Sequence, residues 1–155
     1  MIFTLQLLIR LIASFVCSIA FAVIFRAAQR HLLYAGISGV IVYFVYHVIV
    51  VLEGGVFLAA FVSTGFGAVY AEIYARVRRC PVIVMLSAAI IPTVPGGDLY
   101  RAMNKLLHSD MNAALAHLSD TMSIALGIGG GIVVTALAFR VITDKILSKR
   151  KKKHY

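Results

Sequence analysis

The stretch IIPTVPGGDLYRAM, Ile90 to Met103, interrupts a chain that otherwise consists of long apolar runs. It contains two prolines, two glycines and two opposite charges. Pro92 and Pro95 each remove a backbone N–H and disfavour helix at the residue before them, while the Gly96-Gly97 pair adds torsional freedom. The stretch therefore predicts a helix break between residues 91 and 97.

The composition around this stretch is that of a membrane protein. Of the 155 residues, 61% are hydrophobic and 14% are charged, whereas soluble domains have about 45–50% apolar and about 25% charged residues. A spanning helix needs about 20 mainly apolar residues. We expect an all-α integral membrane protein with one membrane domain, residues 1–155, and about five transmembrane helices. The predicted spans are residues 2–25, 32–52, 55–75, 81–103 (the broken one) and 113–140, followed by a basic tail, 141–155. The first run is too long for a signal peptide and predicts a retained span.

Basic residues predict the orientation of these spans, because positive charges in short loops gather on the cytoplasmic side. They are concentrated after the first span, after the third span and in the tail: Arg26 and Arg30; Arg76, Arg78 and Arg79; and Arg140 with the lysines that follow. These segments fall on one side only if the chain crosses five times. The pattern predicts an external amino terminus, a cytoplasmic carboxy terminus and a fourth span that crosses.

Several other functions are disfavoured by the sequence. The net charge of +9 arises at span ends without interleaved aromatic residues, so no nucleic-acid binding is expected. The five histidines form no His-Glu-x-x-His pattern, no serine lies in a Gly-x-Ser-x-Gly elbow, and the two cysteines lack metal-ligand spacing. We expect no enzyme activity, no metal and no cofactor.

Small residues on three spans predict close helix packing. Gly127-x-x-x-Gly131 has the spacing that lets a second helix approach within a membrane, with local unwinding around a ligand as the alternative. The same packing is predicted for the second and third spans, at Gly36, Gly39 and Ser63-x-x-x-Gly67.

The predicted break has the chemistry of a substrate site. Irregular backbone at membrane depth is tolerated only where protein, water or ligand reaches it. The restarted helix would present free amides and a partial positive charge to an anion, and discontinuous helices place such ends against substrate carboxylates in secondary transporters. The candidate substrate-binding residues are Pro92, Pro95, Gly96, Gly97, Asp98, Tyr100 and Arg101. The alternative is that the span is short and PTVPGG is its exit loop.

Ionisable residues near the spans suit more than one role. Asp98 fits contact with a substrate ammonium group, proton transfer or a helix cap. His117 and Asp120 share a helix face at i,i+3 and suit a proton relay, although Asp120 equally suits a solvated helix end. Arg10 is expected to reach the outer interface, and Glu72 and Arg76 to form an ordinary i,i+4 pair.

Two long stretches and two short motifs carry a family resemblance. The stretches are FAVIFRAAQRHLLYAGISGVIVYFVYHVI, Phe21 to Ile49, and FVSTGFGAVYAEIYARVRRCPVIVMLSAAIIPTVPGGDLYRAM, Phe61 to Met103. The motifs are Pro-x-x-Pro-Gly with a following tyrosine, at Pro92, Pro95, Gly96 and Tyr100, and SDMNAAL, Ser109 to Leu115. In these features the chain resembles the small half of the split form of the bacterial threonine/serine exporter family.

The resemblance implies a subunit of a secondary-active, proton-linked exporter in the bacterial cytoplasmic (inner) membrane. It implies a larger transmembrane partner, and two five-span halves would form an inverted pair. The implied substrates are threonine and serine, or C4-dicarboxylates such as succinate. Two alternatives stay open: a homo-oligomeric channel lined by the glycines of the fifth span, and a structural or stabilising membrane subunit.

Overall fold

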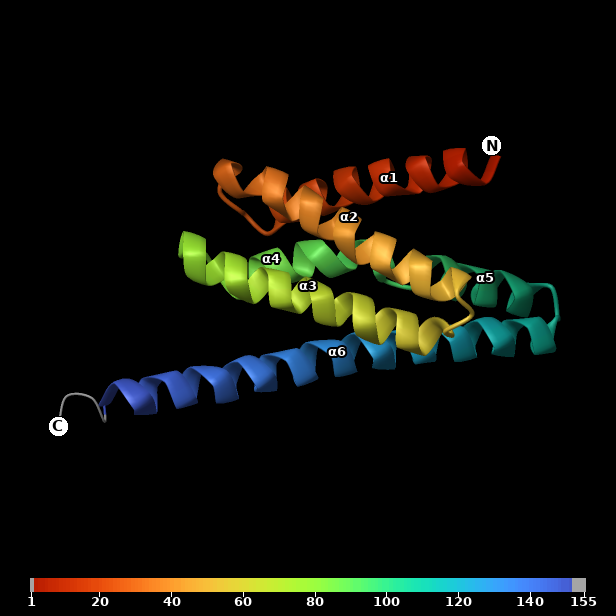
Figure 1. Ribbon diagram of the computed structural model, residues 1–155. Helices are drawn as coiled ribbons and strands as arrows, with labels where there is room; N and C mark the ends of the chain where they lie inside the picture. Colours follow the sequence, from red (N-terminus) through yellow and green to blue (C-terminus); the bar gives the residue numbers. More distant parts are fainter. Residues whose placement is uncertain (1, 152–155) are drawn as a thin grey trace.

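The computed structural model describes the backbone of residues 2–151 as a set of helices joined by short loops (Figure 1). The helices are α1 (Ile2–Ile24), α2 (Gln29–Val51), α3 (Val56–Arg78), α4 (Val82–Ile90), α5 (Gly96–Leu107) and α6 (Met111–Lys151), with a 3-10 helix, η1 (Ile91–Thr93), between α4 and α5. Among the described residues, α1, α2, α3 and α6 are long and apolar enough to cross a membrane, and the bent pair around η1 makes a fifth candidate. The predicted all-α membrane fold is confirmed.

Small side chains fill the centre of the bundle formed by α1 to α4. The buried cluster consists mainly of alanines, together with larger side chains from α3 and α4: Ala22, Ala35, Ala68, Ala71, Tyr74, Met85, Leu86 and Ala88. Small residues let helices pack closely within a membrane, where the hydrophobic effect does not drive helices together. Large apolar side chains lie instead on the outer surface, as expected for a surface that faces lipid.

Glycines bring α6 against α3, as predicted. A Cβ atom added at Gly127 would lie 2.6 Å from the Phe57 carbonyl oxygen, and one at Gly131 would lie 2.5 Å from the Phe61 carbonyl oxygen. Both distances are too short for a real side chain, so only glycine permits this approach. The other predicted small residues also lie at helix contacts, namely Gly36 and Gly39 against α1 and Gly67 against α2.

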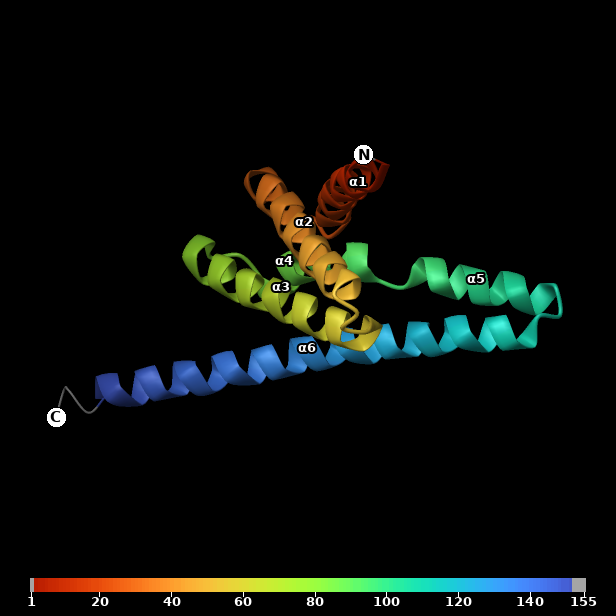
Figure 2. The same cartoon turned by 45° about the vertical axis from the view of Figure 1, so that its right-hand side comes forward.

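Helix α6 is longer than the predicted fifth span, 113–140. It begins at Met111 and continues to Lys151, because no glycine or proline follows Gly131 to end it. Its 41 residues would extend about 62 Å at 1.5 Å per residue, roughly twice the hydrocarbon core of a bilayer. Part of the predicted tail is therefore helical, and residues 152–155 lie outside the described part of the chain. Figures 1 and 2 show α5 and the start of α6 as a hairpin that extends past the loop between α2 and α3.

The basic segments lie together at one end of the bundle. At this end α1 is followed by α2, α3 is followed by α4, and the second half of α6 arrives (Figure 1). We term it the basic end and define it by Arg26, Arg30, Arg78 and Arg79. The start of α1 and the end of α6 lie at opposite ends of the molecule (Figure 1). This arrangement is the one that five crossings require, and the side of the membrane that each end faces stays a prediction.

Candidate functional site

The fourth candidate span breaks within the predicted segment. Helix α4 ends at Ile90, η1 follows, and α5 restarts at Gly96 with a bend of 45°. Val94 is extended, with ψ 130°, as expected before Pro95. Ile91 differs from the expectation, because it keeps helical torsions (φ −50°, ψ −43°) although a proline follows it. Its N–H still donates to a carbonyl of α4, so the chain makes one 3-10 turn before it leaves the helix.

Groups freed by the break are bonded within the chain. The Thr93 hydroxyl donates to the Ile90 carbonyl oxygen at 2.7 Å, and the Val94 N–H donates to the Ile91 carbonyl oxygen at 3.1 Å. Thr93 is buried, and η1 packs against both α1 and α2. The 3-10 turn η1 is thus packed within the bundle, whereas Val94, Gly96 and Gly97 after it are exposed. Whether PTVPGG is part of a substrate site or an exit loop stays a prediction.

A cleft of about 260 Å³ lies beside the break, between α1 and α2. Its lining includes Arg10, Ser14, Cys17, Tyr43 and Pro92. Arg10 was expected at the outer interface, and Ser14 and Tyr43 were not among the predicted site residues. Each of these residues has a polar side chain within an apolar run, and this was the signal that the sequence offered. Their proximity to Pro92 could not be predicted, because it depends on how α1 and α2 pack over η1.

Helices α5 and α6 bring three ionisable side chains together. Asp98 Oδ1 accepts a hydrogen bond from Arg101 Nη1 at 3.0 Å and lies 3.5 Å from His117 Nδ1. The second contact is within ion-pair range but is not a hydrogen bond, since His117 Nδ1 is buried without a hydrogen-bond partner among the described residues. It becomes an ion pair only when His117 is protonated. We term Asp98, Arg101 and His117 the α5–α6 charge cluster.

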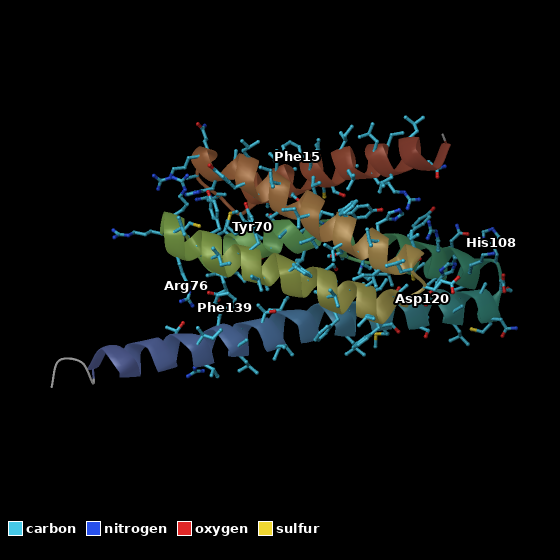
Figure 3. The ribbon with its side chains drawn as sticks, viewed as in Figure 1. Phe15, Tyr70, Arg76, His108, Asp120 and Phe139 are labelled. Atoms are coloured by element: carbon cyan, nitrogen blue, oxygen red, sulfur yellow. The ribbon has the colours of Figure 1, made fainter. Side chains whose placement is uncertain are left out.

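Of the other predicted site residues, Gly96, Gly97, Tyr100 and Asp120 are exposed, and Pro92 and Pro95 are half-buried. Asp120 is exposed on α6 (Figure 3), and both it and Asp98 act electrostatically on Tyr46 of α2. Tyr100 is 70% exposed. Apart from the adjacent residues and the nearby backbone of α5 itself, no described atom lies within 4 Å of a Cβ atom added at Gly96 or Gly97. The start of α5 therefore presents an open face rather than an enclosed pocket.

The predicted pair of Glu72 and Arg76 forms, and its role is structural. Arg76 Nη2 lies 3.3 Å from Glu72 Oε2. The same guanidinium donates to Thr143 at 3.0 Å and lies over the ring of Phe139, 5.4 Å from its centroid (Figure 3). Arg76 thus ties α3 to α6. Among the described residues no three side chains gather that could hold a metal ion, and both cysteines are free thiols.

Most of the chain matches the sequence profile of one known protein family. The sequence profile of the family described as "Threonine/Serine exporter, ThrE" matches residues 10–138. The chain belongs to the threonine/serine exporter family. The match includes the broken span, the charge cluster and the glycine motif of α6, and it confirms the resemblance found in the sequence. The family is one of transporters, which agrees with the prediction that the chain is not an enzyme.

This chain is much shorter than a curated relative. A curated protein named "Threonine/serine exporter", from Corynebacterium glutamicum, is 28% identical over 125 residues. The aligned part is 81% of this chain but 25% of the relative, so the chain spans about a quarter of the length of that exporter. No solved structure matches the chain.

Proposed function

We propose that this member of the exporter family is one subunit of a secondary-active exporter of threonine and serine, and that it works with a larger transmembrane partner. The main support is the partial match: the chain aligns over 81% of its own length with 25% of an exporter. In this proposal the protein lies in the bacterial inner membrane, with the basic end in the cytoplasm and the amino terminus outside.

The start of α5 is the proposed site for the substrate carboxylate. The first N–H groups of a helix have no acceptor within the helix and carry a partial positive charge. Arg101 adds a full charge one turn along, and its side chain is 63% exposed. Asp98 would meet the ammonium group. One cation and one anion on neighbouring turns match a zwitterionic amino acid better than succinate, which has no ammonium group.

The open face of α5 is the proposed contact with the partner. Transporters with inverted repeats bind substrate at the interface between repeats, and a second half seated over Gly96, Gly97 and Tyr100 would enclose the site. A channel lined by the glycines of α6 has less support, because Gly127 and Gly131 already lie against α3.

Asp98 and His117 are the proposed carriers of the coupling proton. A protonated His117 forms an ion pair with Asp98 at 3.5 Å. When the proton leaves, Asp98 retains its pair with Arg101 at 3.0 Å and is less neutralised, so that it attracts a substrate ammonium group more strongly. Substrate and proton thus compete for one carboxylate, as proton-coupled exchange requires. Asp120 is proposed as a further relay position on the same helix.

Efflux from cells that co-express the chain and its larger partner tests this proposal. Arg101→Ala is expected to reduce threonine and serine efflux by about tenfold or more, because a hydrogen bond to a charged group contributes about 1.5–3 kcal/mol. Lys105→Ala is the matched control, since Lys105 lies one turn further along α5 and pairs with Asp110 at 3.4 Å. It should preserve efflux at equal membrane insertion.

The outcomes separate the competing functions. Normal efflux by Arg101→Ala would remove this arginine from the site. Efflux by the partner alone would identify the chain as a stabilising subunit, and succinate efflux without threonine efflux would identify a dicarboxylate carrier.

A further inference from the structure

Two clefts meet at the basic end of the bundle. The first, of about 440 Å³, lies between α2 and α3 and is lined by Arg30, His31, Tyr34, Tyr74, Arg78 and Arg79, with Val77 at its side. The second, of about 360 Å³, extends to the end of α1 and the start of α4. Arg30, His31 and Arg79 line both clefts. Each cleft has the size of a small-molecule site.

A buried histidine fixes the direction of the hydrogen bonds in the first cleft. His31 is 6% exposed. Arg30 Nε donates to His31 Nε2 at 3.2 Å, so this ring nitrogen is the acceptor and the proton lies on Nδ1. Nδ1 then donates to the Tyr74 hydroxyl oxygen at 2.8 Å. The Tyr74 hydroxyl proton is left to donate to a further acceptor, and Tyr74 lines this cleft.

Positive charge in the clefts is not balanced by the residues around it. Within the part of the chain that the structure describes, the lining of both clefts includes no carboxylate, and Arg79 forms no ion pair there. Arg78 is held differently, over the ring of Tyr34 at 5.7 Å and 3.4 Å from its hydroxyl oxygen. Guanidinium groups that share a cleft repel one another, and an anion with several acceptor oxygens would remove this repulsion.

The second cleft has an apolar wall beside its basic residues. Phe25, Val84 and Met85 line it beside Arg26 and Arg79. A basic region next to an apolar one suits an amphiphile, and basic pockets between transmembrane helices bind phospholipid headgroups.

We propose that the two clefts form a phosphate-binding site. Arg30, Arg79 and the Tyr74 hydroxyl are the donors, and guanidinium groups suit phosphate because they offer paired N–H groups in one plane. The apolar wall favours the headgroup of an anionic phospholipid over soluble phosphate as the source. The site lies at the basic end and is independent of the proposed substrate site on α5.

Two variants each remove one of its cations. Arg79 has φ 52°, a left-handed conformation that glycine adopts without strain, so Arg79→Gly removes the guanidinium while it relieves the backbone. Arg30→Gln removes the other cation that lines both clefts. Arg140→Gln is the matched control, because Arg140 is exposed on α6 and does not line either cleft.

The test uses the purified full-length chain in detergent with phosphatidylglycerol, phosphatidylcholine or inorganic phosphate. Native mass spectrometry measures retained lipid, and thermal unfolding measures stabilisation by each probe. The chain and Arg140→Gln are expected to retain phosphatidylglycerol in preference to phosphatidylcholine. Arg79→Gly and Arg30→Gln should each weaken retention about tenfold or more, as for loss of a hydrogen bond to a charged group.

Each outcome decides the proposal or the source of the phosphate. Stabilisation by inorganic phosphate that Arg79→Gly abolishes would support the site and identify a soluble source. Equal retention of the two lipids without any effect of inorganic phosphate would overturn it. So would an equal loss in Arg140→Gln and Arg79→Gly.

Discussion

Gly131→Ala tests whether the contact between α3 and α6 depends on the absence of a side chain. The added methyl carbon would lie 2.5 Å from the Phe61 carbonyl oxygen, 3.2 Å from the Gly65 nitrogen and 3.2 Å from Thr64 Cβ. Two of these neighbours are backbone atoms, so no rotation of a side chain can make room. The two helices must move apart, and overpacking of this kind costs about 1–3 kcal/mol.

Gly129→Ala is the matched control on the same helix. Apart from the adjacent residues and the nearby backbone of α6 itself, no described atom lies within 4 Å of a Cβ atom added at Gly129. Both substitutions gain about 0.8–1 kcal/mol of helix propensity, so this gain cancels when the two variants are compared. Gly131→Ala should therefore have a free energy of unfolding about 1–3 kcal/mol below that of Gly129→Ala.

Unfolding by sodium dodecyl sulfate in mixed micelles, followed by circular dichroism, measures this difference. Equal stability of the two alanine variants would refute the reasoning, because it would mean that α6 does not rest on the backbone of α3. A lower stability of Gly129→Ala would show that the opposite face of α6 makes the close contact.

Two further predictions concern the break and the tie between α3 and α6. Thr93→Val removes the 2.7 Å hydrogen bond to the Ile90 carbonyl oxygen and should lower the free energy of unfolding by about 1 kcal/mol, whereas Thr93→Ser should retain most of it. A loss in Thr93→Ser without a loss in Thr93→Val, in the same mixed-micelle assay, would show that the methyl group matters and not the hydroxyl. Glu72→Gln should cost less than about 1 kcal/mol, because the Arg76 side chain is 50% exposed and exposed ion pairs contribute little. A loss of several kcal/mol there would mean that this pair is shielded from water.

Hydropathy and the proline pattern predicted the helices and the break, because both depend on local composition. Helix ends were less accurate. His31 was expected in a loop but lies in α2, since hydropathy detects membrane depth and polar residues can continue a helix. The i,i+3 spacing paired His117 with Asp120, yet the structure places His117 beside Asp98. That contact depends on how the α5–α6 hairpin closes, which no local pattern encodes. The basic clefts likewise combine segments from four helices.

The break separates the polar groups that it frees into two sets. On the α4 side, the Ile90 and Ile91 carbonyl oxygens are hydrogen-bonded by Thr93 and the 3-10 turn, and η1 is covered by α1 and α2. On the α5 side, the Gly96 N–H donates to the Val94 carbonyl oxygen at 2.8 Å and the Leu99 N–H donates to the Pro95 carbonyl oxygen at 3.1 Å. Among the described residues, the N–H groups of Gly97 and Asp98 are the first-turn donors left without a backbone acceptor. We expect these two donors, which carry a partial positive charge, to favour an anion over a cation at this end of α5. Asp98 in the first turn would oppose this preference, but Arg101 lies 3.0 Å from its carboxylate and balances the charge.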